Sequence, residues 1–285
     1  MKVSIIYQPD SMISKFNPPF QMVEKYKNNT FFTRLLRKFF SNKKFVQPFI
    51  NNPKIKNLDS DVIIIFDSVS LEFIKWVKKH NQDKRLILWY WNPVTLTHNP
   101  SLIPDGIEKW SYSITDCEKY NLKYNTQFCM DKYKDFKVDV KSEYDVIFVG
   151  RDKGRSSFLR DFEIKINNLG LKTNFIIIQT EKQFIPYDKL IELTQKSKCI
   201  FDLCAFDDAG LSLRALEALH MEKKVITNNT SYLKEPFYKK ENVFILGKDN
   251  LSTLNEFINS PYEKVDEDIK NYYFFDNWAN RFLEE

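Results

Sequence analysis

The sequence GLSLRALEALHMEKKVITN at residues 210–228 combines a helix signal with a strand signal. Its apolar residues recur first at helical spacing and then form a short β-branched run. Asp208 or Ser212 is placed to cap the start of the helix, which would point free backbone N–H groups at an anion. Arg214 and Glu217 are three residues apart and share one helical face, so one can reach a phosphate and the other a pair of ribose hydroxyls. The alternative is an Arg–Glu ion pair on the surface of an ordinary helix.

The same alternation of strand and helix signals runs along the whole chain and is typical of an α/β fold. We expect strands at residues 2–7, 62–66, 86–91, 112–115, 126–130, 145–149, 173–178, 199–203, 224–227 and 243–246. We expect helices at residues 31–45, 71–79, 156–169, 187–197, 211–221, 251–259 and 266–283. A polar, charged stretch at residues 131–144 is expected to link two α/β domains.

A second candidate anion site follows the strand expected to end at residue 149. Gly150 lets the backbone approach a ligand closely. Arg151, Lys153 and Arg155 can neutralise phosphate oxygens, and the helix that follows adds N–H donors. A solvated basic turn is the alternative.

Composition bounds the class of protein. The chain has 285 residues, of which 43% are hydrophobic and 28% charged, so it can form two packed domains. A net charge of +5 suits an anionic partner, such as a nucleotide diphosphate or an anionic lipid surface. No basic stripe carries a nucleic-acid motif, so we expect no nucleic-acid partner. The four cysteines and three histidines have no metal-site spacing, and we expect no protein-bound metal.

The chain shows neither a signal peptide nor an apolar run long enough to span a bilayer. We therefore expect a cytoplasmic protein with reduced cysteines.

The stretch 210–228 resembles the donor-binding motif of GT-B glycosyltransferases, and most closely that of bacterial enzymes of lipopolysaccharide or capsular polysaccharide synthesis. Their pattern is Gly-Leu-Ser/Thr, then Arg, then Glu-Ala-Leu, then Lys-Lys-hydrophobic-Ile-Thr-Asn. The matching residues are Gly210, Leu211, Ser212, Arg214, Glu217, Ala218, Leu219, Lys223, Lys224, Ile226, Thr227 and Asn228. Residues 90–94 and 116–124 also resemble these enzymes, so the resemblance extends over residues 89–228.

This resemblance implies a GT-B fold, with two Rossmann-like domains facing a central cleft. Residues 1–140 would bind the acceptor, residues 141–265 would bind the nucleotide sugar, and residues 266–285 would form a helix packing back on the N-terminal domain. The implied reaction transfers a sugar from a nucleotide diphosphate donor to a saccharide acceptor, which would be lipid-linked, in surface polysaccharide synthesis. No cofactor beyond the donor substrate and no metal is expected. The candidate donor-binding residues are Gly150, Arg151, Lys153, Arg155, Asp208, Gly210, Leu211, Ser212, Arg214 and Glu217.

One position departs from the pattern of many retaining GT-B enzymes, which carry two glutamates separated by seven residues. Counting back from Glu217, that position is Ala209, beside Asp208. The stereochemical outcome therefore stays open. Two other functions also stay open: a sugar-nucleotide epimerase on the same fold, and a non-catalytic GT-B scaffold for other transferases.

Inverting transfer needs a side chain that accepts the proton of the acceptor hydroxyl. In an open α/β sheet, ligands gather beyond the carboxyl ends of the strands. In the N-terminal half this rule nominates Asp10 and Asp67, together with His98 in the loop after the third expected strand. Asn92 and Asp116 also follow strands. Each of these residues could instead serve a turn or a helix cap.

Residues 31–45 form a basic amphipathic segment. One helical face carries Phe31, Phe32, Leu35, Leu36, Phe39 and Phe40, and the cations are Arg34, Arg37 and Lys38, with Lys43 and Lys44 just beyond. Such a helix can lie in a membrane interface, here the inner leaflet of the cytoplasmic membrane. The alternative is a helix docked on the core of its own domain with a solvated basic side.

Overall fold

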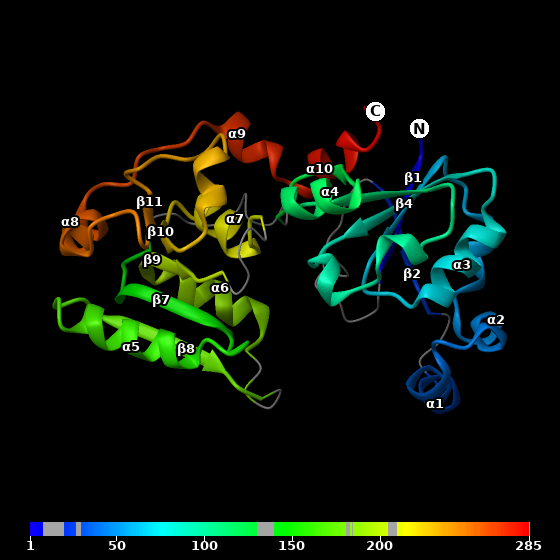
Figure 1. Cartoon of the computed structure of the whole chain (residues 1–285), viewed down its shortest axis with the longest axis horizontal. Helices are drawn as coiled ribbons and strands as arrows, with labels where there is room; N and C mark the ends of the chain where they lie inside the picture. The colour runs from blue at the N-terminus through cyan, green and yellow to red at the C-terminus, as the bar shows by residue number, and fades with distance from the viewer. Residues whose placement is uncertain are drawn as a thin grey trace. The chain divides into compact units, whose positions relative to one another are not determined.

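A computed structural model of the chain describes residues 1–7, 20–26, 30–129, 140–180, 183, 185–204 and 210–284. The chain divides into two compact units. Unit 1 comprises Met1–Gln127 together with Phe275–Glu285, and unit 2 comprises Phe128–Phe274. Each unit contains one parallel sheet with helices packed on it (Figure 1), so the predicted α/β class is confirmed.

The sheet of unit 1 has the strand order β2-β1-β3-β4-β5-β6, and every pairing is parallel. Its strands are β1 (Val3–Tyr7), β2 (Gln21–Glu24), β3 (Val62–Phe66), β4 (Arg85–Tyr90), β5 (Ile107–Ser111) and β6 (Lys123–Tyr124). All five residues of β3, VIIIF, are buried, as expected for a central parallel strand that is covered on both faces.

The helices of unit 1 come from both ends of the chain. They are α1 (Phe31–Phe40), α2 (Gln47–Ile50), α3 (Leu71–His80), α4 (Ile114–Tyr120) and α10 (Phe275–Arg281). Helix α10 belongs to this unit because its aromatic residues enter the core. Trp278 is fully buried, and its ring centroid lies 5.9 Å from that of Phe66 and 5.3 Å from that of Trp89.

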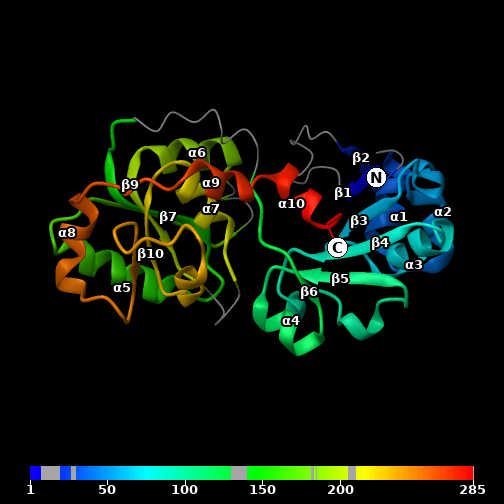
Figure 2. The same ribbon diagram turned by 90° about the horizontal axis from the view of Figure 1, so that it is seen from above.

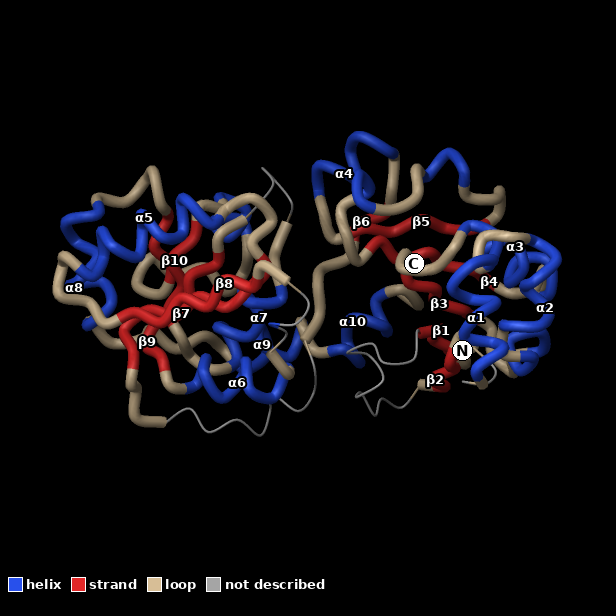
Figure 3. The backbone as a smooth tube through the Cα atoms, turned by 90° about the horizontal axis from the view of Figure 1, so that it is seen from below, coloured by secondary structure: helices blue, strands red, loops and turns tan. Residues whose placement is uncertain are grey.

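The sheet of unit 2 has the strand order β11-β10-β9-β7-β8, again with parallel pairings throughout. Its strands are β7 (Tyr144–Arg151), β8 (Thr173–Ile178), β9 (Ser197–Asp202), β10 (Lys224–Thr227) and β11 (Val243–Ile245). Its helices are α5 (Ser156–Asn167), α6 (Tyr187–Gln195), α7 (Leu213–His220), α8 (Leu254–Asn259) and α9 (Glu267–Tyr272). Helices α5 and α6 lie on opposite sides of β7 (Figures 2 and 3).

Both sheets share one feature of strand order that positions ligands. In unit 1 the chain runs from β1 outward to β2 and then returns to place β3 on the other side of β1. In unit 2 the chain likewise runs from β7 to β8 and then places β9 on the other side of β7. Right-handed crossovers put the connecting helices on opposite faces at such a reversal. The crevice at the carboxyl ends of the two central strands is where open α/β sheets bind ligands.

Three expected elements of secondary structure are wrong. Residues 112–115 do not form a strand, because the Ser113 hydroxyl accepts a hydrogen bond from the backbone N–H of Asp116 and starts helix α4. The described part of residues 126–130 also forms no strand, and Cys129 makes only an isolated bridge to Phe274. Residues 266–283 form two helices, α9 and α10, rather than one.

The remaining elements agree with the expectation within a few residues, except that the first helix ends at Phe40 instead of residue 45. Strands β2, β5 and β6 are not evident from hydrophobicity. Within the described ranges, none of the helices has the length and hydrophobicity that a membrane span requires.

Candidate functional site

The carboxyl ends of β7 and β9 bring two of the expected anion-binding segments together. Strand β7 ends at Arg151, strand β9 ends at Asp202, and the two strands pair directly. After β7 the backbone turns through Lys153, with a φ of 48°, and Gly154, with a φ of 77°. This places the basic loop and the start of α7 at the same switch point of the sheet.

Arg214 lies at the centre of this site. Its guanidinium donates to the carbonyl oxygen of Val149 from Nε at 3.3 Å and from Nη2 at 3.0 Å. Its Nη1 lies 3.5 Å from Oδ1 of Asp202. The buried Asp202 carboxylate also accepts hydrogen bonds from the Ser212 hydroxyl at 2.8 Å and the Tyr232 hydroxyl at 2.9 Å. These contacts hold the Arg214 side chain across the end of β7.

Gly150 makes this position of Arg214 possible. A Cβ atom on residue 150 would lie 2.4 Å from Nη2 of Arg214 and 3.2 Å from the ring of Phe148. The guanidinium of Arg214 also faces the Phe148 ring, with 5.5 Å between Cζ and the ring centroid. Only glycine therefore leaves room for the guanidinium to cross the strand.

The basic loop adds three more cations. Arg155 donates to the carbonyl oxygens of Asp152 at 3.3 Å and Arg151 at 3.0 Å, and also to that of Leu203, so it ties the loop to the end of β9. Partial desolvation and three neighbouring guanidinium groups lower the pKa of Lys153 below its usual value. Cations that are close enough to lower one another's pKa are a feature of sites that bind an anion.

We refer to the side chains of Arg151, Lys153, Arg155 and Arg214 as the cation cluster. The pKa of Lys153 is lowered by the guanidinium groups of the other three cluster members, namely Arg151, Arg155 and Arg214.

Helix α7 begins at Leu213, with Ser212 as its N-cap, whose hydroxyl accepts from the backbone N–H of Arg214 at 3.1 Å. Of the two expected caps, Ser212 is therefore confirmed, and Asp208 lies outside the described residues. Gly210 has a φ of 71°, and its carbonyl accepts from the Asn229 side chain at 2.7 Å, which fixes the entry to the helix. The neighbouring Leu211 is buried.

Glu217 lies one turn further along α7 and is also buried. Its Oε1 accepts a hydrogen bond from the hydroxyl of Tyr187, at the start of α6, at 2.8 Å. Burial and the Glu217 charge together raise the pKa of Tyr187, so the phenol stays protonated and donates. Although Arg214 and Glu217 are three residues apart on one helix, their contacts go to different elements.

In unit 1, Asp67 directly follows β3 at the β1/β3 reversal. Its side chain is buried, and the carboxylate accepts from the backbone N–H of Asn92 at 3.0 Å and from the Asn92 amide at 3.3 Å. Burial raises the pKa of Asp67 to about 6, although the hydrogen bonds from Asn92 oppose this shift. A carboxylate that titrates near 6 is suited to accept a proton close to neutral pH.

The other candidate bases differ in their surroundings. His98 lies near enough for its charge to lower the pKa of Asp67, and its Nε2 donates to the carbonyl oxygen of Val69. Asp116 is buried, and its carboxylate accepts from the backbone N–H of Val94 at 2.9 Å. Asp10 lies outside the described residues. Among the described candidates, Asp67 and His98 are therefore neighbours at one end of the sheet.

Asp202 and Tyr187 contribute to the site without being nominated by the sequence patterns. Asp202 lies inside the strand expected at residues 199–203, so the rule that nominates Asp67 passes over it, whereas the structure ends β9 at Asp202. Tyr187 carries no such signal, because its partner Glu217 is 30 positions away in the sequence.

No family model matches the chain, and no curated protein matches its sequence. Solved structures do match it. The DNA-modifying enzyme β-glucosyltransferase, solved with and without its substrate uridine diphosphoglucose, matches with a TM-score of 0.50 and 13% identity, covering 100% of this chain and 95% of that chain. The fold is GT-B.

Two further solved structures match this chain over nearly its whole length. The N-terminal domain of trehalose-6-phosphate phosphatase from Candida albicans has a TM-score of 0.53 and 11% identity, covering 99% of this chain and 95% of that chain. Anabaena HepE in complex with UDP has a TM-score of 0.49 and 11% identity, with coverages of 100% and 95%. Identity this low establishes the fold alone.

Proposed function

We propose that this chain is a glycosyltransferase that uses a nucleotide diphosphate sugar as its donor. The cation cluster at the β7/β9 switch point of a GT-B fold carries this proposal. Transfer releases a nucleoside diphosphate, and cations fixed in place before the reaction stabilise the charge that develops on it. A donor diphosphate would in turn relieve the repulsion within the cluster.

The roles follow from the contacts of each side chain. Arg151, Lys153 and Arg214 would bind the diphosphate, with the N-terminus of α7 adding N–H donors. Arg155 joins the basic loop to the end of β9, so we assign it a positioning role. Glu217, held by Tyr187, would accept the ribose hydroxyls. No metal is needed for these roles.

We propose that unit 1 binds the acceptor and that Asp67 accepts the proton of its hydroxyl, with His98 as the second candidate base. The acceptor would be a saccharide, lipid-linked, in cell-surface polysaccharide synthesis. The resemblance of residues 89–228 to enzymes of that class supports this assignment. It also favours transfer over epimerisation or a scaffold role.

Release of nucleoside diphosphate from a panel of UDP-, GDP-, ADP- and dTDP-sugars tests the proposal. Each donor is incubated with and without a panel of aryl glycosides and cell-envelope glycolipids as acceptors. The proposal expects release from one donor that depends on an acceptor, together with a glycosylated product. Conversion of the sugar without acceptor would establish an epimerase, and no turnover of any donor that binds would favour the scaffold.

The pH dependence of transfer follows from the Asp67 carboxyl. A general base must be ionised, and the pKa of Asp67 is raised to about 6. We therefore expect kcat/KM to be constant above about pH 7 and to fall about tenfold per pH unit below about pH 5. Initial rates over this range test the expectation. A rate that stays level through pH 6 would remove Asp67 as the base.

Replacing Gly150 by Ala tests the position of Arg214. The new Cβ displaces the end of a flexible side chain rather than backbone, so the fold should persist. The displaced Arg214 should lose one charge-assisted hydrogen bond to the nucleoside diphosphate. We expect the affinity, measured by calorimetry, to fall about tenfold or more.

Gly170→Ala is the control for this substitution. A Cβ there meets nothing within 4 Å, and the positive φ of 80° affects stability rather than the distant donor site, so the affinity should stay unchanged. Equal affinity in Gly150→Ala and wild type would show that this position of Arg214 does not matter for binding.

A further inference from the structure

Helix α1 presents an apolar face to solvent. None of its ten residues is buried. The half-buried residues of the helix are Thr33, Leu36 and Arg37, which fall on one side of the helix, so that side faces the rest of unit 1. The opposite side is exposed, and with the segment after it presents Phe31, Phe32, Leu35, Phe39, Phe45 and Phe49. These residues therefore do not dock on the core of their own domain, and Leu36 is the one residue of the expected apolar face that is half-buried.

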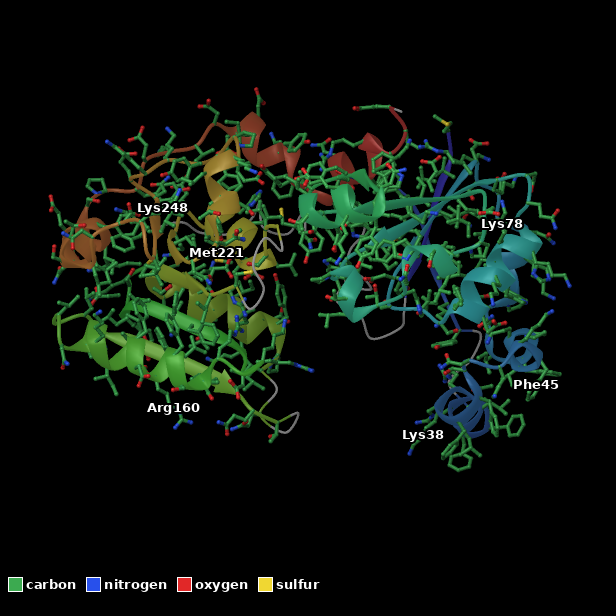
Figure 4. The ribbon with its side chains drawn as sticks, viewed as in Figure 1. Lys38, Phe45, Lys78, Arg160, Met221 and Lys248 are labelled. Carbon is green, nitrogen blue, oxygen red and sulfur yellow. The ribbon has the colours of Figure 1, made fainter. Side chains whose placement is uncertain are left out.

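The helix is held in this orientation by its polar side. The Arg37 guanidinium stacks over the ring of Tyr26, with 4.5 Å between Cζ and the ring centroid. The Ser70 hydroxyl, at the start of α3, donates to the carbonyl of Ser41 just after α1, at 3.2 Å. Helix α1 lies beyond α2, outside the layer formed by the sheet and α3 (Figure 1). Lys38 and Phe45 both project outward from this segment (Figure 4).

The charge of the chain is concentrated on the same segment. Between Glu24 and Asp59 there are nine Lys or Arg residues and no Asp or Glu. Since the whole chain carries +5 and this segment +9, the remaining residues carry a net −4. The positive field therefore surrounds the exposed phenylalanines and favours an anionic surface over a neutral one.

A pocket adjoins the apolar face on the side of α2 and α3. Its volume is about 790 Å³. Four lysines line it, namely Lys44, Lys56, Lys75 and Lys79, alongside the apolar surfaces of Phe45, Pro48 and Trp76. Its one acidic residue, Glu72, is paired with Lys75 at 2.8 Å. A pocket with cations beside an apolar floor suits the phosphate of a lipid headgroup and the start of its acyl chain.

We propose that α1 and α2 dock on an anionic lipid bilayer. Phe31, Phe32, Leu35, Phe39, Phe45 and Phe49 form this docking surface and enter the boundary between headgroups and acyl chains. The surrounding lysines and arginines, with those of the pocket, bind the lipid phosphates. Neither step uses the donor site, so the proposal of membrane binding is tested independently of the proposal of glycosyl transfer.

Vesicle co-sedimentation with the whole protein tests the proposal. Vesicles of phosphatidylcholine alone are compared with vesicles of equal parts phosphatidylcholine and phosphatidylglycerol. We expect binding to the anionic vesicles that is at least about tenfold tighter and that weakens as salt is raised. No binding to either vesicle, or equal binding to both, would overturn the proposal.

Substitutions distinguish binding through the docking surface from nonspecific adsorption to vesicles. Phe31→Ser, Phe39→Ser and Phe45→Ser together should reduce vesicle binding at least about tenfold without lowering the melting temperature, because all three side chains are exposed. Phe158→Ser, which replaces an exposed aromatic of unit 2, is the matched control and should bind vesicles as the wild type does.

Sedimentation of the protein without vesicles completes the test. A dimer that the triple substitution dissociates would assign the surface to a second copy of the chain and overturn the lipid assignment.

Discussion

Replacing Asp67 by Asn is expected to lower the rate of glycosyl transfer about 10²- to 10⁴-fold, the usual contribution of a general base. The amide cannot accept the proton of the acceptor hydroxyl but can still accept the hydrogen bond from the backbone N–H of Asn92. Nucleoside diphosphate affinity should not change, because the cation cluster belongs to unit 2. Single-turnover rates and calorimetry on the same preparation measure the two effects.

The same substitution should stabilise the protein at neutral pH. The pKa of Asp67 is raised by burial from 3.8 to about 6, so the folded state holds its proton more tightly than the unfolded state does. The resulting stability is present below about pH 4 and is lost as pH rises to 6. The neutral amide of the variant avoids this loss, which corresponds to up to about 3 kcal/mol in the free energy of unfolding at pH 7. The melting temperatures of variant and wild type should therefore converge at low pH.

Asp61→Asn is the matched control, because Asp61 precedes β3 at the opposite end of the strand and is exposed. It should not change the rate of transfer. If Asp67→Asn transferred sugar at the wild-type rate, Asp67 would not be the base. A fall in melting temperature at pH 7 would instead show that its carboxylate serves the fold.

Replacing Arg214 by Met is expected to weaken nucleoside diphosphate binding about a hundredfold, by removing charge-assisted contacts to the phosphates. It should also destabilise the fold, because the buried Asp202 carboxylate loses its ion-pair partner Arg214. Arg160→Met, on the exposed side of α5 (Figure 4), removes a solvated cation from the same unit and should have neither effect.

The double variant Arg214→Met/Asp202→Asn separates these two roles. Removing the buried carboxylate that has lost Arg214 should restore most of the melting temperature, since the amide oxygen introduced at position 202 can still accept from Ser212 and Tyr232. Nucleotide affinity should stay low, because no cation returns. Recovery of affinity together with stability would mean that Arg214 acts only through Asp202.

The elements of unit 2 were largely predictable because each strand is a clear apolar run between polar turns. Strands β8 and β10 have the expected bounds, and β7 extends the expected strand at both ends. Strand β5 is not evident from the sequence because the charged residues Glu108 and Lys109 interrupt its apolar pattern. Glu108 pairs with Arg85 of the neighbouring β4 at 2.6 Å, a long-range contact that local hydrophobicity cannot reveal.

The sequence indicates which residue types the candidate site contains but not how they are arranged. Charge and motif nominated Arg151, Lys153 and Arg214, but the strand order that joins their loops depends on pairing β7 with β9. The raised pKa of Asp67 likewise depends on burial, which the sequence indicates only through the preceding apolar strand. The outward orientation of α1 was undecidable from amphipathicity, because a helix with one apolar face can bury or expose it.

Calorimetric titration of UDP, GDP, ADP and dTDP into the purified protein tests the cation cluster most directly. We expect one of these nucleotides to bind with one-to-one stoichiometry, more weakly as salt is raised, and about a hundredfold more weakly to the folded Arg214→Met/Asp202→Asn variant. If none binds the wild type, or if wild type and variant bind equally well, the cation cluster is not a donor site.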